Sequence, residues 1–152
     1  MRSASRPSIG DSGRGQALVE FALVFPLFLL LLFGLIEVGR FVYVNNAFNE
    51  AAREAARFGS VEQWRYACPK DAKSLTRRSC TEQVARDRMA GAPAAFQVVA
   101  ECSTSECRAN DLLTVTIFTN ASGPDAYRFL TPIVGQLIGA PVVSGQAQVV
   151  VQ

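Results

Sequence analysis

A single carboxylate lies within the longest apolar run of this 152-residue sequence, and it is the first candidate for chemistry. Glu20 is the only charged residue between Ala17 and Ile36. A carboxylate in hydrocarbon is costly and usually functional, so it requires a partner. A nearby ammonium group in a low-dielectric medium would serve. The alternative is that Glu20 reaches the membrane interface beside Arg14.

Four cysteines form the second chemical group: Cys68, Cys80, Cys102 and Cys107. In an oxidising compartment, four cysteines in a small domain indicate two disulfides. Three pairings are possible, and we favour Cys68–Cys80 and Cys102–Cys107 because both close local loops. Closing the longer loop would contribute on the order of 3 kcal/mol. A zinc site and free structural thiols are the alternatives, but neither spacing is the C-x2-C of zinc ribbons.

The residue that enzymes most often use as a general base is missing. The sequence contains no histidine, which removes the commonest general base, the commonest metal ligand and every serine–histidine or cysteine–histidine pair. The formal net charge of +2 is spread along the chain without a basic block, so there is no electrostatic footprint for nucleic acid. We therefore expect no enzyme, no metal site, no cofactor and no nucleic-acid partner.

The apolar run must place Glu20 in a membrane. Twenty helical residues extend roughly 30 Å, the hydrocarbon thickness of a bilayer. Three arginines and one acid, Asp11, precede the run, whereas the charges that follow it balance. The positive-inside rule then puts the N-terminus in the cytoplasm and the rest outside. A secretory signal peptide is the alternative, but this run is too long and lacks a clean cleavage site.

An amphipathic stretch follows the apolar run. Its apolar residues recur at helical spacing: Phe41, Val44, Phe48, Ala51, Ala52, Ala55 and Phe58. We therefore predict one continuous helix that ends at Gly59. The alanine pairs 51–52 and 55–56 would let another element approach closely, either the chain's own domain or another subunit.

The outer part of the chain predicts a small α+β domain. A short helix is expected at 81–90, ended by Gly91 and Pro93, and another at 131–139. Strands are expected at 96–102, 112–119 and 143–151, the last two with alternating apolar and polar residues. The predicted architecture is a mostly antiparallel sheet packed on the long helix.

Gly15, Glu20 and Phe21 together resemble the processing site of type IV pilin-like proteins. That resemblance implies that a membrane-embedded prepilin peptidase cuts after Gly15 on the cytoplasmic side. Gln16 would become the new N-terminus and Glu20 the fifth mature residue. In such proteins this carboxylate pairs with the N-terminal amine of a neighbouring subunit, so Glu20 and Phe21 are the expected assembly residues.

Residues 14–61 resemble, more narrowly, the TadE-like pseudopilins of tight-adherence (Tad) pilus systems. The matching elements are G-Q-A-L-V-E-F-A, the proline after Phe25, the I-E-x-G-R sequence that leaves the membrane, and A-A-R-E-A-A-R. The segment from Leu130 to Val149 is similar to the same group, whereas 62–110 carries no match. The resemblance covers roughly half of the chain.

The resemblance implies a minor pilin with a pilin-like α+β fold that takes part in assembly of an adhesive Tad pilus. The expected domains are a polar, disordered leader at 1–15, a transmembrane part at 16–36, an extracytoplasmic helix at 37–59 and a globular domain at 60–152. The implied partners are the peptidase, the major pilin, other pseudopilins, the inner-membrane assembly platform and the lipid bilayer. The location would be the bacterial inner membrane, or the pilus at the cell surface. The alternative is an uncleaved, membrane-anchored periplasmic scaffold or binding protein.

Overall fold

The computed structural model describes residues 12–92, 94–124, 126–130, 136 and 139–152, with side chains from residue 15 onward. Its elements are α1 (Ser12–Ser60), α2 (Trp64–Ala67), α3 (Arg77–Arg88), β1 (Gln97–Cys102), β2 (Leu112–Phe118) and β3 (Ser144–Val150). Contacts divide the chain into two units, 1–36 and 37–152, with helix α1 contributing to both.

The first unit contains the apolar part of α1. The helix begins at Ser12, so the end of the predicted leader is helical rather than disordered. Gly15 consequently lies in the first turn of α1. Pro26 is inside the helix, which α1 accommodates without ending. A proline removes one backbone hydrogen bond, and helices in membranes tolerate that loss where local adjustment or a neighbour satisfies the freed carbonyl.

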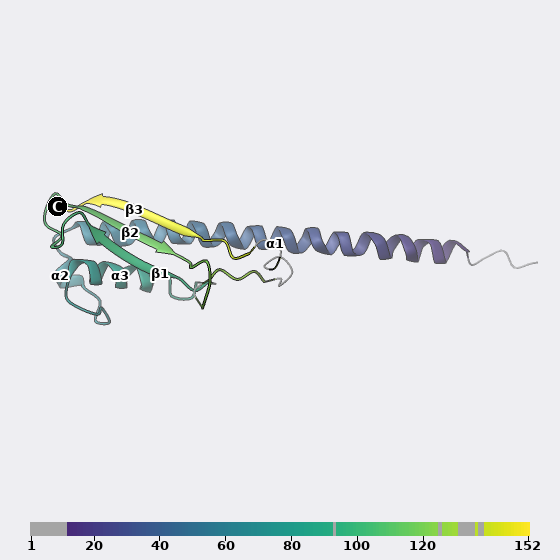
Figure 1. Ribbon diagram of the computed structural model, residues 1–152, viewed down its shortest axis with the longest axis horizontal. Coiled ribbons are helices and arrows are strands. Elements are labelled where there is room, and N and C mark those ends of the chain that lie inside the picture. Colours follow the sequence, from purple (N-terminus) through teal and green to yellow (C-terminus); the bar gives the residue numbers. More distant parts are fainter. Residues whose placement is uncertain (1–11, 93, 125, 131–135, 137–138) are drawn as a thin grey trace, which may run out of the picture. The chain divides into compact units, whose positions relative to one another are not determined.

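The second unit is α+β: a three-stranded antiparallel sheet in the order β1-β2-β3, packed on the outer part of α1. Figure 1 shows the strands running alongside this part of the helix. Val115 on the central strand is paired with Ala100 on one side and Ala147 on the other. The expected alternation on β2 is confirmed, because Leu113, Val115 and Ile117 are fully buried.

The core forms between the helical stripe and the inner face of the sheet. Val44, Phe48, Ala52 and Ala55 are fully buried, as their spacing predicts. Phe58, which was expected on the same stripe, is only half-buried. All four alanines at 51–52 and 55–56 are buried by the chain's own domain. Of the two expected occupants of this helix surface, the structure therefore shows the domain.

Two glycines allow the closest approaches in this core. A Cβ on Gly145 of β3 would lie 2.5 Å from the backbone nitrogen of Asn49, so the strand backbone lies directly on α1. Gly59 was expected to end α1, but the helix continues to Ser60. A Cβ on Gly59 would meet the Thr81 side chain and, at 2.5 Å, a methyl of Leu113. Gly59 is therefore needed for packing against α3 and β2.

Helix α3 begins earlier than the helix expected at 81–90. α3 starts at Arg77 because the Thr76 hydroxyl caps it, accepting the Ser79 N–H at 3.2 Å. α3 ends at Arg88, and Gly91 follows with a φ of 89°. The four-residue α2 was not predicted, since so short a helix has no periodicity to read. Pro93 and most of the helix expected at 131–139 lie outside the described residues.

α3 also closes one edge of the sheet. The Glu82 carboxylate accepts the backbone N–H of Ala100 at 3.2 Å, and Arg86 donates to the carbonyl of Val98 at 3.3 Å. Glu82 and Arg86 are themselves an i,i+4 ion pair at 3.7 Å. Two backbone groups on the open edge of β1 are thus satisfied by side chains of one helix, and covering an edge in this way is a common protection of an edge strand.

Candidate processing and assembly site

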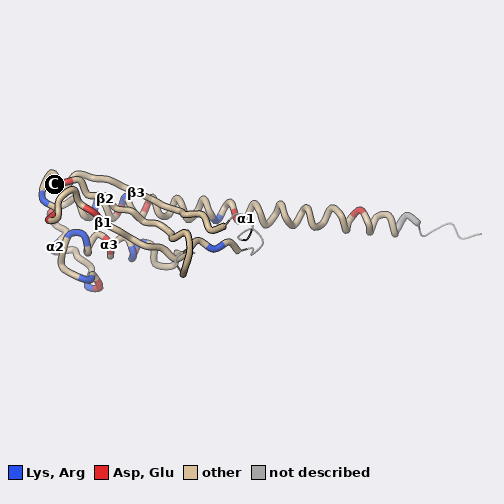
Figure 2. The backbone as a smooth tube through the Cα atoms, viewed as in Figure 1, with Lys and Arg blue, Asp and Glu red and all other residues tan. Residues whose placement is uncertain are grey.

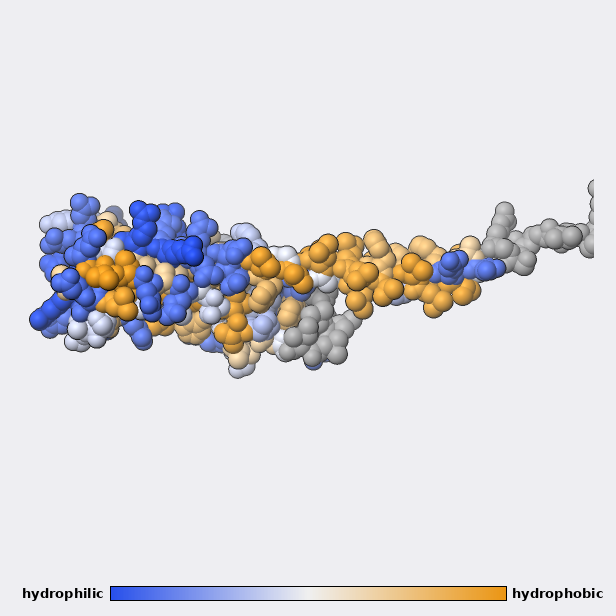
Figure 3. All heavy atoms as spheres, turned by 90° about the horizontal axis from the view of Figure 1, so that it is seen from above, coloured by the Kyte–Doolittle hydropathy of each residue, from blue (hydrophilic) through white to orange (hydrophobic). Residues whose placement is uncertain are grey.

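The membrane-spanning candidate is the exposed apolar surface of the first unit. Within the described residues, one helix is long and apolar enough to cross a bilayer, with a mean hydropathy of 2.6 over its most apolar 18 residues. None of that window is buried inside the protein. Figure 3 shows this surface as nearly continuous hydrophobic side chains, and Figure 2 shows one acidic position within it. Such a surface suits a single-pass membrane anchor.

Glu20 is that acidic position, and its side chain is exposed. It lines a shallow groove on the helix surface with Gly15, Gln16, Val19 and Leu23. No hydrogen bond or ion pair joins Glu20 to a side chain that the structure describes, and the side chain of Arg14 lies outside that set. The helix therefore brings the two residues of the expected cleavage site, Gly15 and Gln16, and the carboxylate onto one stretch of surface.

Phe21, the other expected assembly residue, is also exposed, at 61% of its surface. Its ring stacks on that of Phe25 one helical turn later, with the ring centroids 5.1 Å apart. Together the two rings form a ridge on the helix rather than a contact with the domain. Both are available to lipid or to another apolar helix.

Two charged residues at the start of the second unit carry a contact that the sequence analysis missed. Glu37 is only 4% exposed, and its carboxylate oxygens accept the backbone N–H of Leu130 at 3.1 and 3.2 Å. Arg40, one turn later, pairs with Glu37 at 3.7 Å and donates to the carbonyl of Arg128 at 2.5 Å. The I-E-x-G-R sequence thus holds residues 128–130 against α1.

An aromatic cluster completes this contact. The guanidinium of Arg40 lies 5.1 Å from the centre of the Tyr127 ring, a cation–π arrangement. Tyr127 is almost fully buried between Phe41 and Phe129, with edge-to-face geometry toward both. Burial raises the pKa of Tyr127, while the positive charge of Arg40 opposes that shift. The opposite charges of Glu37 and Arg40, one helical turn apart, were the only feature of the sequence related to this contact. Its other partners lie far along the chain.

The cysteines are paired as the sequence favoured. Disulfides join Cys68 to Cys80 and Cys102 to Cys107, and no cysteine is free. The first ties the loop after α2 to the first turns of α3, and the second closes the turn after β1. All four sulfurs are therefore used in disulfides, which contradicts both the zinc site and the free thiols.

Comparison with known proteins finds a similarity in the N-terminal part of the chain. Residues 15–57 match the family model of the TadE-like proteins. No curated protein and no solved structure matches the chain. The matched segment contains Gly15, Glu20 and the Glu37–Arg40 pair, so it includes both the exposed apolar surface and the residues that hold 128–130. Through residues 15–57, this chain is similar to the TadE-like proteins.

Proposed function

We propose that this protein is a minor pilin, or pseudopilin, that a prepilin peptidase processes and that takes part in assembly of an adhesive Tad pilus. The TadE-like segment suggests a role in Tad pilus systems. The observation that carries the finer proposal is Glu20, an exposed carboxylate on an otherwise uncharged apolar helix. Such a group requires a partner in a membrane or filament, and in this proposal another subunit supplies it.

Cleavage between Gly15 and Gln16 would create that partner. The new α-amino group would carry a positive charge about one helical turn from Glu20 on each subunit. Pairing of Glu20 with the amine of a neighbouring subunit would neutralise both charges in a low-dielectric environment. The Phe21 and Phe25 rings would then pack in the same contact, at a surface the chain's own domain leaves open.

The domain arrangement supports a structural role. In the proposal, 1–15 is the leader, 16–36 spans the inner membrane with its N-terminus in the cytoplasm, and 37–59 and 60–152 lie outside. Disulfides are expected in that outer compartment. The alanines of α1 are buried by the domain, so contacts with the major pilin, other pseudopilins and the assembly platform would use the apolar span and the domain surface.

Intact-mass spectrometry tests the processing step. The chain is expressed with and without a prepilin peptidase, and with the peptidase the mature mass should begin at Gln16. Gly15→Asp should block cleavage, whereas Gly13→Asp adds the same charge two residues earlier and serves as the control. An uncleaved chain in the presence of an active peptidase would overturn the proposal in favour of an uncleaved membrane-anchored scaffold.

A second measurement tests the carboxylate. Glu20→Gln should insert into the membrane and be cleaved normally, yet assemble fewer pili, because the amide cannot neutralise the amine. Glu50→Gln removes an exposed carboxylate from the outer part of α1 and is the control. Unchanged piliation in the Glu20→Gln strain would remove the role assigned to this residue.

A further inference from the structure

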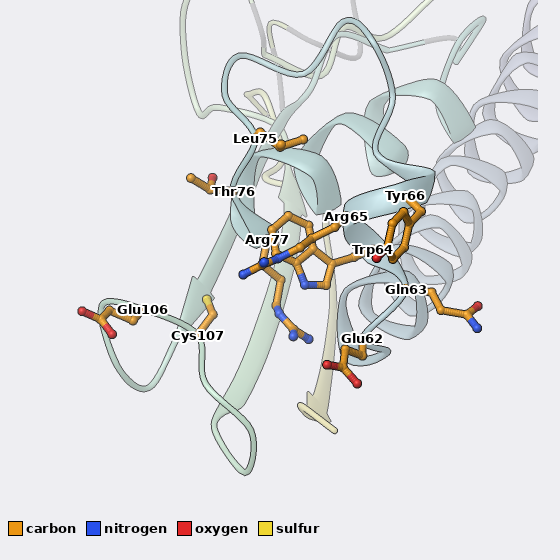
Figure 4. A pocket seen from close by; sticks show the side chains of 10 residues that line it. All are labelled: Glu62, Gln63, Trp64, Arg65, Tyr66, Leu75, Thr76, Arg77, Glu106 and Cys107. Carbon is orange, nitrogen blue, oxygen red and sulfur yellow. The ribbon is translucent and has the colours of Figure 1, made fainter.

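A cavity of about 600 Å³ lies outside the TadE-like segment, where α2 and the start of α3 meet the Cys102–Cys107 loop. Figure 4 shows the lining side chains, which come from three stretches of the chain: 62–66, 75–77 and 106–107. None of them takes part in the proposed processing or assembly. A site here is therefore independent of the function proposed above.

Two arginines flank one indole in this cavity. The guanidinium carbons of Arg65 and Arg77 lie 5.4 and 5.5 Å from the centre of the Trp64 ring. Figure 4 shows both arginines across the Trp64 ring, in the middle of the lining. Trp64 is only 7% exposed, so the ring is a fixed support that attracts a cation to its face. The same arrangement brings two positive charges close together.

No carboxylate that the structure describes forms an ion pair with these arginines. Among the residues that the structure describes, no acidic side chain lies within 4 Å of either guanidinium. Arg77 donates to the carbonyl of Gly59 at 2.7 Å, which fixes its position but adds no negative charge. Burial and the charge of Arg65 lower the pKa of Arg77, and the negative charge of Glu62 opposes this shift. An anion bound between the two arginines would relieve this repulsion.

The rest of the lining favours hydroxyl groups around that anion. Glu62, Gln63 and the Thr76 hydroxyl provide oxygen acceptors at the wall of the cavity. Glu106 is a further acceptor, held by Arg108 at 2.8 Å and thus kept from the arginine pair. Tyr66 has a ring that is 95% exposed at the rim, where it can lie against the C–H face of a sugar. Two cations and two carboxylates together disfavour a ligand that carries more than two negative charges.

We propose that this cavity binds an acidic saccharide, with the carboxylate of a uronic acid held by Arg65 and Arg77. Guanidinium groups match the planar geometry of a carboxylate. The ring hydroxyls of the sugar donate to Glu62 and Gln63, and one sugar face lies on Tyr66. The volume is within the range of small-molecule sites and accommodates one or two sugar units.

The single tryptophan of the sequence makes the site measurable. The full-length chain in detergent micelles is titrated with digalacturonic acid, and Trp64 fluorescence is recorded. The expected result is a saturable change with the acid, and at least about tenfold weaker binding of neutral galactobiose, since one charge-assisted contact corresponds to about that factor. Equal affinity for the two disaccharides would overturn the proposal.

Variants separate the site from general charge effects. Arg65→Gln should weaken digalacturonic acid binding about tenfold or more. Lys70→Gln removes an exposed cation outside the cavity and should leave the affinity unchanged. Arg77→Gln should also weaken binding, with circular dichroism to verify folding because Arg77 contacts Gly59. Undiminished affinity of Arg65→Gln would contradict the assignment.

Competition identifies the ligand class. Sodium acetate, inorganic phosphate and a hexaglutamate peptide are titrated against protein half-saturated with digalacturonic acid. The proposal expects each to reverse the fluorescence change only at concentrations at least about tenfold above the half-saturating concentration of digalacturonic acid. Reversal by the peptide at or below that half-saturating concentration would assign the cavity to acidic peptides, and reversal by acetate or phosphate at such a concentration would reduce it to a general anion site.

Discussion

Glu37 and Leu130 are joined by two hydrogen bonds across 93 residues of sequence, since both carboxylate oxygens accept the Leu130 backbone N–H. Glu37 is the first residue after the apolar span, and Leu130 follows the aromatic cluster around Tyr127. Together with the bond from Arg40 to Arg128, the contact fixes residues 128–130 against α1. It also explains how a buried carboxylate is accommodated beside the apolar part of α1: Glu37 is neutralised by Arg40 and hydrogen-bonded by the backbone.

Replacing Glu37 by alanine should release this contact. The N–H of Leu130 and the Arg40 guanidinium would lose a charged acceptor, which costs about 1–3 kcal/mol. Amide hydrogen exchange at Leu130 should therefore accelerate by about tenfold or more, while exchange in β2 is less affected. Glu50→Gln, an exposed site on the same helix, is the control. Unchanged exchange at Leu130 would show that the contact does not hold the segment.

Gly145→Ala should destabilise the domain. The new Cβ would lie 2.5 Å from the Asn49 nitrogen and the Phe48 carbonyl carbon, so β3 would have to move off the helix. Overpacking of this kind typically costs about 1–3 kcal/mol in the free energy of unfolding. Urea unfolding followed by circular dichroism measures it.

Gly39→Ala is the matched control for that change. A Cβ at Gly39 meets nothing within 4 Å, and the residue lies inside α1. Alanine has the higher helix propensity, so this variant should be as stable as the original chain or up to about 1 kcal/mol more stable. Equal losses in both variants would mean that the close approach at Gly145 is not the cause.

Asp111 should make the Cys102–Cys107 loop sensitive to acid. The hydrogen bond from the Thr104 hydroxyl is the main cause that lowers the pKa of Asp111 below its ordinary value of 3.8, with the Arg108 N–H adding to it. Above pH 3.8 the carboxylate is charged in the folded and unfolded states, and its stabilisation is complete. As the pH falls further, the unfolded chain binds the proton first, and the stabilisation is lost as the pH passes through the lower, folded value.

A carboxyl-detected NMR titration measures this behaviour. The midpoint for Asp111 should lie below 3.8, and Thr104→Val should raise it because that variant removes the largest stabilising hydrogen bond. A midpoint unaffected by Thr104→Val would contradict the explanation.

Removing the Cys68–Cys80 disulfide should cost more than removing the Cys102–Cys107 disulfide. The first closes a loop with a sequence separation of 12, and the second one of only 5. Chain-entropy estimates give about 3 and about 2 kcal/mol respectively. Paired serine substitutions at each bridge, compared by urea unfolding, test this order, and a larger loss for the shorter loop would reverse it.

Periodic and covalent features of this protein could be predicted from sequence, whereas its long-range contacts could not. The buried stripe around Phe48 and the alternation of Val115 with its neighbours follow from helical and strand periods. The start of α3 was misplaced because the Thr76 cap depends on local backbone geometry rather than on an apolar pattern.

Other features depend on partners that a linear pattern does not reveal. Gly59 was read as a helix end, yet it is a close contact with Thr81 and Leu113. Glu37 and Arg40 were read as balancing charges, because nothing in the sequence indicated that Tyr127 and Leu130 would reach them. The cavity around Trp64 was missed for the same reason, since its lining comes from three separate stretches.

The packing of Gly145 on Phe48 has a consequence for biosynthesis. The ribosome makes the helix first and its covering strand near the end, so the apolar stripe of α1 remains without β3 while the intervening chain is translated. At typical elongation rates this delay is on the order of ten seconds. During that time the nascent chain presents Val44 and Phe48 without the strand that covers them in the folded domain, so this stripe is exposed to aggregation until β3 is made.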